Sequence, residues 1–320
     1  MSGKRMVFMK VIDCVKKGQI LSIEILPPNR GQNIEEIYAV LDELMNFPIS
    51  FINVTKHAPE MTYLELEDGI VKVPKVKRPG TVGMTAALMN RYNIDVVPHV
   101  LCFGMNKYQI EDMLIDLHLI GVRNLFVIRG EYENQTIEEK DSYSHASDLV
   151  KQISNMNMGE YLYPCENAKP TDFCIGVAGY PEKHFEAPNI EEDMRYLKKK
   201  IESGADYVIT QMIFDFDVYK KFVERARQLS INVPIIPGVK PVVSLKSIYT
   251  IPRKFFVNIP ESFVKQMQEA KTHREEFQIG TKYMAKLVEK LLSSGAPGVH
   301  VFTMGKGQST KALLEAVFNR

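Results

Sequence analysis

Eight short apolar runs, separated by stretches with helical periodicity, constrain the fold of this 320-residue chain more than any other feature. Most of the runs are continuous and rich in β-branched residues, which is typical of parallel strands that are buried on both faces. They occupy residues 20–26, 50–54, 95–101, 124–129, 173–178, 206–211, 233–237 and 298–302. Eight strands with intervening helices in about 300 residues predict an α/β protein with a (β/α)8 TIM-barrel architecture. A doubly wound open sheet is the alternative.

Helical patterns fill most of the intervals between these runs. They predict helices over 33–45, 108–120, 189–203, 215–229 and 306–318. The basic, amphipathic segment 1–18 predicts a further N-terminal helix rather than a signal peptide, because it lacks a continuous apolar core. Asn189 and Asp215 are the expected N-caps of the helices that they begin.

The regular alternation is interrupted near 56–80, 130–143, 155–171 and 255–292. The first of these segments has alternating residues and is expected to leave the barrel after the second strand. The last is expected to add helices before the final strand. Because no repeat or linker divides the chain, residues 1–320 are predicted to form one domain.

Composition argues against several kinds of partner. Forty basic and 39 acidic residues give a formal charge of +1, without the basic excess of nucleic-acid-binding proteins. No apolar run approaches the roughly 20 residues of a membrane helix, so we expect a cytoplasmic protein with no membrane partner. The four cysteines lack the spacing of a zinc site, and no metal is expected. Cys102 and Cys174 lie in apolar runs and are expected to be buried free thiols.

The first predicted strand carries an acid inside an apolar run. Glu24 lies between Ile23 and Ile25, so the interior of a barrel would desolvate its carboxyl and raise the pKa. A carboxylic acid with a raised pKa is a useful proton donor near neutral pH. The alternative is a carboxylate that is paired with a buried Arg or Lys.

The segment 172–187 changes from an apolar strand to a loop that is rich in rings and ionisable groups. Tyr180, Glu182, His184 and Glu186 follow one another within seven residues. Packing explains the apolar part of this segment but not the loop. In a parallel barrel the carboxyl ends of the strands form the ligand-binding face, so the loop predicts a binding site.

Other strand ends carry polar side chains as well. His99 lies in an apolar run and is either a core histidine or a ligand contact. Arg129, Gly130 and Glu131 combine a cation, a permissive backbone and an anion, or form a local salt bridge. Gln211 offers an amide that can donate and accept hydrogen bonds at the edge of a heterocycle.

Two further groups suit phosphate or another anion. Asp193, Tyr196 and Lys200 share a helical face with Lys199 beside it, and a solvated surface is the alternative. Lys306 lies between two glycines just before a helix, where an anion can bind. The chain has no P-loop and no GxGxxG after a strand, which disfavours a Rossmann nucleotide domain.

These segments, taken in order, resemble the methylenetetrahydrofolate reductase family, flavin-dependent enzymes of one-carbon metabolism. The resemblance runs from about residue 20 to about residue 305 and is strongest to forms from the Bacteroides group of bacteria. The matching segments are SIEILPP (22–28), NVTKHA (53–58), PHVLC (98–102), LIGVRNLFVIRGE (119–131), YSHASDLV (143–150), GVAGYPEKHFEAPN (176–189), DYVITQMIFD (206–215) and VPIIPGVKPV (233–242).

The resemblance implies a barrel that binds FAD at the carboxyl ends of its strands. It implies ping-pong turnover, in which NADH or NADPH reduces the flavin and the flavin reduces 5,10-methylenetetrahydrofolate to 5-methyltetrahydrofolate. Glu24 matches the general acid, which would protonate N10 of the folate. The implied partners are the folate and the nicotinamide nucleotide, and we expect a homo-oligomer.

The resemblance also implies the binding residues. Positions that match cofactor contacts are Thr55, Lys56, Ala58, His99, Arg129, Gly130, Glu131, Ala146, Tyr180, His184, Ala187, Asp193, Tyr196, Lys199 and Lys200. Positions that match substrate contacts are Glu131, Gln211 and Lys306. Two of these depart from the family pattern: Glu131 replaces the usual Asp, and Lys306 replaces an Arg, which keeps the charge but loses the bidentate fork.

Two other functions stay open. The Glu131 departure suggests a flavin- or folate-binding subunit of a larger redox complex, without turnover of its own. Oxidation of NADH by the isolated chain would argue against that alternative. A barrel lyase or aldolase is disfavoured because no obvious Schiff-base lysine lies within a strand, and bound FAD would exclude it.

Overall fold

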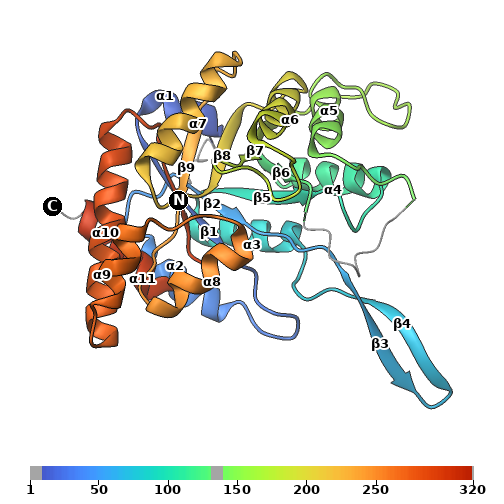
Figure 1. The fold of residues 1–320 in the computed structure, drawn as a ribbon. Helices are drawn as coiled ribbons and strands as arrows, with labels where there is room; N and C mark the ends of the chain where they lie inside the picture. The colour runs from blue at the N-terminus through green and yellow to red at the C-terminus, as the bar shows by residue number, and fades with distance from the viewer. Residues whose placement is uncertain (1–8, 131–139, 319–320) are drawn as a thin grey trace, which may run out of the picture.

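In residues 9–130 and 140–318, which the computed structural model describes, eight parallel strands close into a barrel (Figure 1). The strands follow the order β1-β10-β9-β8-β7-β6-β5-β2 around it. They are β1 (Ile20–Ile25), β2 (Phe51–Val54), β5 (Asp95–Leu101), β6 (Asn124–Ile128), β7 (Cys174–Gly179), β8 (Tyr207–Met212), β9 (Ile235–Val239) and β10 (Gly298–Phe302). All eight predicted strands are confirmed, with ends that differ by at most two residues, and so is the (β/α)8 barrel.

Helices surround the barrel, as Figure 1 shows. Those that the sequence predicts are α1 (Val11–Lys17), α2 (Glu35–Leu44), α4 (Lys107–Leu119), α6 (Ile190–Glu202), α7 (Phe216–Gln228) and α11 (Gly307–Phe318). Three others, which no specific pattern predicted, are α3 (Thr81–Tyr92), α5 (Ala146–Met156) and α8 (Leu245–Phe255). The predicted N-caps are confirmed, since Asn189 accepts a hydrogen bond from the Glu192 amide at 2.8 Å and Asp215 accepts one from the Asp217 amide at 2.9 Å.

Two of the interruptions have regular structure. Segment 56–80 contains an antiparallel hairpin of β3 (Glu60–Leu66) and β4 (Gly69–Lys75) that extends away from the barrel (Figure 1). Segment 255–292 contains α9 (Glu261–Gln268) and most of α10 (His273–Ser293), as expected before the last strand. No helix in the described parts of the chain is both long and apolar enough to cross a membrane.

Alternation along the strands decides which side chains enter the barrel. In β1, Leu21 and Ile23 belong to the large apolar core that also contains residues of the surrounding helices, whereas Ile20 belongs to a separate cluster with Phe51 and Tyr207. Successive strand side chains point to opposite faces. Glu24 therefore shares the inner face with Ile20, and it lies nearer the carboxyl end of the strand.

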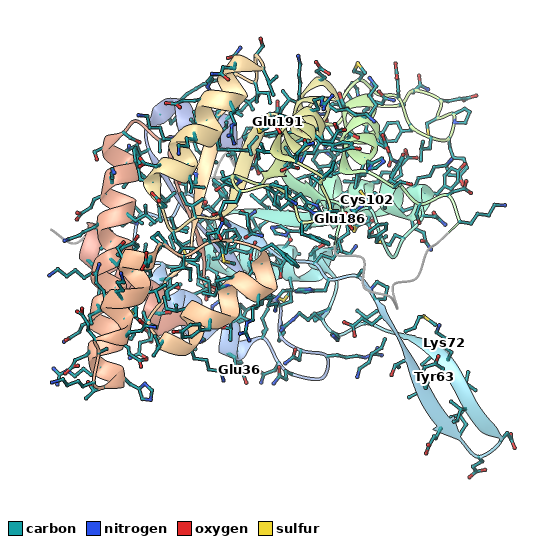
Figure 2. All side chains as sticks on the ribbon, in the orientation of Figure 1. Glu36, Tyr63, Lys72, Cys102, Glu186 and Glu191 are labelled. Carbon is teal, nitrogen blue, oxygen red and sulfur yellow. The ribbon has the colours of Figure 1, made fainter. Side chains whose placement is uncertain are left out.

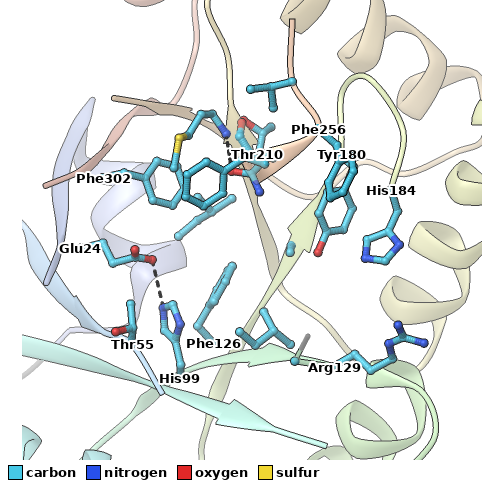
Figure 3. Close-up of a pocket in the computed structure, with 18 of the residues that line it drawn as sticks. Glu24, Thr55, His99, Phe126, Arg129, Tyr180, His184, Thr210, Phe256 and Phe302 are labelled. Carbon is cyan, nitrogen blue, oxygen red and sulfur yellow. Dashed lines mark hydrogen bonds and ion pairs between the residues drawn. The ribbon is translucent and has the colours of Figure 1, made fainter. Parts of the chain in front are cut away.

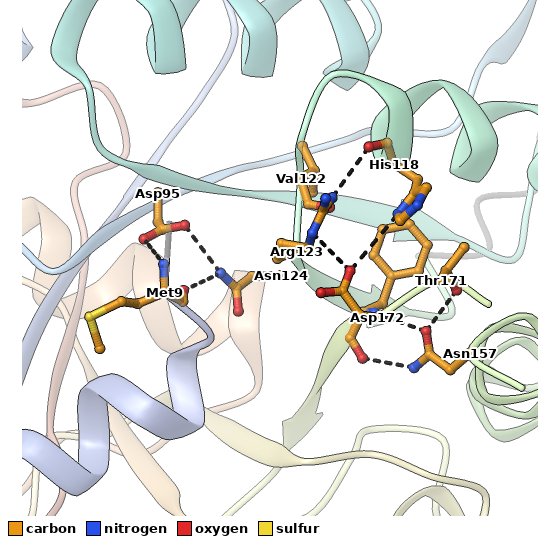
Figure 4. A network of polar contacts seen from close by, with 10 residues as sticks. Met9, Asp95, His118, Val122, Arg123, Asn124, Asn157, Thr171 and Asp172 are labelled. Carbon is orange, nitrogen blue, oxygen red and sulfur yellow. Dashed lines mark hydrogen bonds and ion pairs between the residues drawn. The ribbon is translucent and has the colours of Figure 1, made fainter. Parts of the chain in front are cut away.

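A polar network closes the other end of the barrel, where the strands begin (Figure 4). The backbone of Met9 donates to Asp95 at 2.9 Å and accepts from the Asn124 amide group at 2.8 Å. Val11, the first residue of α1, donates to Asn124 at 2.8 Å and is buried against the inner cluster. Because α1 covers this end, the inside of the barrel is open to solvent from the carboxyl ends of the strands.

A tight helix contact holds the segment that follows β9. Gly280 of α10 lies so close to the backbone of Val242 that an added Cβ would be 1.8 Å from the Val242 carbonyl oxygen. No side chain fits there, because the opposing atom is backbone and cannot rotate away. Gly83 of α3, by contrast, has no neighbouring atom within 4 Å of such a Cβ.

Two glycine-to-alanine changes should therefore have opposite effects on stability. We expect Gly280→Ala to destabilise the protein by about 1–3 kcal/mol through overpacking. Gly83→Ala should stabilise it by up to about 1 kcal/mol, because alanine favours the helix at an exposed site. Urea unfolding of both variants measures the difference, and changes of the same sign would contradict the packing described for α10.

Candidate functional site

A cavity of about 480 Å³ opens at the carboxyl ends of the barrel strands (Figure 3). Its size is typical of small-molecule sites. Predicted site residues that line it are Glu24, Thr55, Lys56, Ala58, His99, Arg129, Gly130, Tyr180, His184 and Gln211. The strand ends that the sequence singles out thus meet in one place, although they are far apart along the chain.

Glu24 occupies the inner wall of this cavity with only 9% of its surface exposed. Its carboxylate Oε2 lies 3.6 Å from His99 Nε2 and 4.0 Å from His300 Nε2 (Figure 3). Burial raises the pKa of the Glu24 carboxyl to about 8, and Lys240 opposes this shift. The carboxyl is therefore mostly protonated at neutral pH, as a proton donor requires.

Both neighbouring histidines are neutral. Burial lowers the pKa of His99 and of His300 to about 3, so neither ring brings a cation that would ionise Glu24. Each ring is held by a polar side chain of a neighbouring strand. Ser22 Oγ lies 2.9 Å from His300 Nδ1, and Asn53 Nδ2 lies 3.2 Å from His99 Nε2. His99 is thus both a core histidine and part of the cavity wall.

One cation beside Glu24 was not predicted from the sequence. Lys240 directly follows β9 and is only 8% exposed. Burial lowers its pKa to about 8, the nearby cations Lys306 and Lys254 lower it further, and Glu24 raises it. A lysine immediately after an apolar run was the available signal, the same signal that identified Arg129.

The loop after β7 is held in place by its own acidic residues. Glu182 accepts hydrogen bonds from the Asn258 backbone at 2.9 Å and from its side chain at 2.8 Å. Glu186 forms an ion pair with Arg129, across from β6. Two of the four residues that drew attention to this loop therefore fix its position, and Tyr180 and His184 remain to face the cavity.

A bulge in β8 presents Gln211. The pairing of β8 with β9 is irregular between Ile209 and Met212, and a bulge beside a site often re-aims a side chain. Gln211 Oε1 accepts a hydrogen bond from the Met212 amide at 2.9 Å, which leaves the side-chain NH₂ available to a ligand. Thr210 Oγ1 steadies the bulge by accepting from the Gly238 amide at 2.9 Å.

Other predicted residues lie outside the cavity wall. They are Ala146, Ala187, Asp193, Tyr196, Lys199, Lys200 and Lys306. Glu131 lies outside the described residues, so the structure gives no view of its role or of a salt bridge with Arg129.

Asp193 and Lys200 nevertheless connect α6 to the cavity. Asp193 accepts a hydrogen bond from the His184 amide at 3.0 Å, and Lys200 donates to the Ala178 carbonyl at 2.6 Å. The Lys200 ammonium also lies 5.9 Å from the centre of the Tyr180 ring. The alternative of a solvated lysine face is therefore wrong for Lys200, whereas Lys199 is more than half exposed and lies 3.9 Å from Asp148.

The raised pKa of Glu24 makes a prediction about stability. Between the unfolded value of 4.5 and the folded value of about 8, the native protein holds a proton that the unfolded chain releases. The stability that this group contributes is complete below that window and falls as the pH rises through it, by up to about 1.4 kcal/mol per pH unit. Glu24→Gln should therefore become more stable relative to the original chain as the pH rises.

Urea unfolding at several pH values across that window measures this difference. Glu36→Gln, at an exposed position, is the control and should show no such trend. Parallel stability curves for Glu24→Gln and the original chain would contradict a protonated Glu24.

Comparisons with known proteins agree on one family. A model of the family described as methylenetetrahydrofolate reductase matches residues 8–317. Methylenetetrahydrofolate reductase 1 of Schizosaccharomyces pombe is 29% identical over 299 residues, which cover 92% of this chain and 45% of that protein. The 5,10-methylenetetrahydrofolate reductase of Pectobacterium carotovorum is 25% identical over 294 residues, which cover 92% of this chain and 88% of that protein. The chain thus spans about half the length of the eukaryotic relatives it matches.

A solved structure supports the fold. It belongs to a Clostridium thermocellum protein that is described as binding two copies of 5-methyl-5,6,7,8-tetrahydrofolic acid. The TM-score is 0.57 at 14% identity, and the match covers 95% of this chain and 96% of that one. At this level of identity the likeness concerns the barrel and not the ligand.

Proposed function

This chain belongs to the methylenetetrahydrofolate reductase family, and from that premise we propose that it reduces 5,10-methylenetetrahydrofolate to 5-methyltetrahydrofolate, with FAD as cofactor and NADH or NADPH as hydride donor. The observation that carries the proposal is the buried, protonated carboxyl of Glu24 in the wall of a cavity large enough for a ring system. Relatives bearing the names of NADPH- and NADH-dependent reductases support a nicotinamide donor without choosing between the two.

The residues around the cavity suit FAD. Phe126, Tyr180 and Phe302 give the cavity ring-bearing walls, and Thr55 Oγ1 is buried without a hydrogen-bond partner in the described residues. Arg129 lies at the same mouth, where a cation suits a pyrophosphate. When bound, FAD would supply hydride chemistry, taking the hydride from the nicotinamide and giving it to the folate.

Further residues would hold the cofactor beyond the ring system. Tyr180 and His184 face the cavity from the β7 loop, with their ring centres 4.6 Å apart. Lys200 and Asp193, one step behind them, would fix this loop and add a buried cation. The exposed Lys199 and Tyr196 would contact the part of the cofactor that leaves the barrel.

Glu24 would act on the folate. Its proton goes to N10 of 5,10-methylenetetrahydrofolate, and the bond between N10 and the bridging carbon then breaks, which leaves an iminium at N5. That carbon is the hydride acceptor of the reaction. The neutral histidines on either side keep Glu24 protonated until the substrate amine accepts the proton.

Gln211 would orient both substrates in turn. Its free NH₂ group faces the same cavity as Glu24 and can donate to a carbonyl oxygen of the nicotinamide or of the pterin. Two planar rings that use the same wall cannot be bound together. A shared cavity therefore supports ping-pong turnover, with the nicotinamide leaving before the folate enters.

Substitution of Glu24 separates the two half-reactions. Glu24→Gln keeps the shape of the side chain but cannot donate a proton of similar acidity. We expect reduction of the bound flavin by NADH to persist, followed in its absorbance, and its reoxidation by methylenetetrahydrofolate to fall about 100- to 10,000-fold. Equal loss of both half-reactions would remove the acid role of Glu24. If the isolated chain binds flavin and folate but completes neither half-reaction, the binding-subunit alternative holds.

Lys240 should set the pH range of the folate half-reaction. The positive charge of Lys240 favours the ionised form of Glu24, so Lys240→Met should raise the pKa of Glu24 further. The alkaline limit of flavin reoxidation by the folate should then move to higher pH, whereas flavin reduction by NADH should keep its profile. Lys240→Arg, which keeps the charge, is the control. An unchanged pH profile in Lys240→Met would show that the lysine does not act on Glu24.

A further inference from the structure

The hairpin of β3 and β4 leaves its apolar side chains in solvent. Leu64 is 48% exposed, Leu66 is 58% exposed and Val71 is 44% exposed. In the described chain the two strands pack on each other and on no other helix or strand to a comparable extent. A two-stranded hairpin without further packing is marginally stable in water. The proposed reductase function gives these residues no role.

The apolar side chains are concentrated on one face of the hairpin. In the observed register Thr62 lies opposite Val73, Leu64 opposite Val71 and Leu66 opposite Gly69. Directly opposed residues share a face, and so do residues two apart along a strand. We call Thr62, Leu64, Leu66, Val71 and Val73 the apolar hairpin face. The opposite face is mixed, because Tyr63 lies opposite Lys72 and Glu65 opposite Ile70 (Figure 2).

Charge divides the hairpin along its length. The tip carries Glu67 and Asp68 between the two strands, whereas the base carries Lys75, Lys77 and Arg78. Glu60 is the acid at the base, and it is paired with Lys77. The base is therefore net positive and the tip is negative.

We propose that the apolar hairpin face binds the same face of a second copy of this chain, with the acidic tip of each hairpin against the basic base of the other. A two-fold axis through the stacked faces brings like faces together, as a symmetric dimer requires. With the hairpins stacked in opposite directions, the two barrels lie at opposite ends and do not collide. Stacking in the same direction would set tip against tip and base against base, and would also bring the barrels into collision.

The size of the hairpin sets the strength of this contact. Seven residues per strand span about 24 Å, and two strands are about 10 Å wide, which gives roughly 240 Å² per copy. Stable interfaces bury about 800 Å² per partner, so the hairpins by themselves give a dimer that dissociates on dilution. Because Glu60 belongs to both β3 and the cavity wall, the dimer also holds one side of the cavity mouth.

Two neighbouring residues on opposite faces test the proposal. Val71 lies on the apolar hairpin face and Ile70 on the other face, and both are exposed. In sedimentation velocity over about a hundredfold range of concentration, we expect the original chain and Ile70→Lys to pass from monomer to dimer. Val71→Lys should weaken the dimer by about 100-fold or more, because the symmetric contact buries the new charge twice. A chain that stays monomeric throughout, or a dimer that Val71→Lys leaves unchanged, would overturn the proposal.

A charge exchange tests the orientation of the two hairpins. Glu67→Lys with Asp68→Lys should weaken the dimer, and so should Lys75→Glu alone, since each change sets like charges against each other. A chain that carries all three changes should dimerise better than either, and failure to recover would rule out tip-to-base packing. Flavin content and thermal unfolding of each variant report on the barrel, so a folding defect or a failure of the proposed enzyme activity is distinguished from loss of the dimer.

Discussion

The site depends on the removal of one carboxyl group from water. Glu24 lies on the inner face of β1, and the closed barrel desolvates it from all sides except the mouth. Desolvation is the larger effect on its pKa, and the nearby charge of Lys240 offsets it only in part. An acid held in its protonated form near neutral pH can give a proton to a weakly basic nitrogen, which an ordinary exposed glutamate rarely does.

The cavity has a neutral end and a charged end. Beside Glu24 the histidines are neutral and are held by Ser22 and Asn53. Toward the β7 loop the residues are charged, and Arg129 is paired with Glu186. A cation at such a mouth attracts the phosphates of a nucleotide cofactor, whereas a cation as close to Glu24 as the histidines are would ionise it. The separation of the two ends therefore lets one cavity both bind an anion and donate a proton.

The hairpin of β3 and β4 is the part of the fold that the barrel does not explain. Its strands are paired only with each other, and its apolar residues are exposed although the chain has a complete core elsewhere. Exposed apolar patches of this kind mark interaction surfaces more often than they serve the fold. A second copy of the chain, as proposed above, would connect assembly to the mouth of the cavity through the base of the hairpin.

The sequence by itself determined the eight strands, the barrel and the inward position of Glu24, because these follow from local periodicity and from the alternation of side chains along a strand. It also indicated the mouth residues that lie at strand ends, among them His99, Arg129 and Gln211. Only the tertiary structure decided that Lys240 is buried beside Glu24, that Arg129 pairs with Glu186, and that Lys200 is inside rather than solvated. These contacts join residues from different strands and helices, so closure of the barrel decides them and no local pattern encodes them.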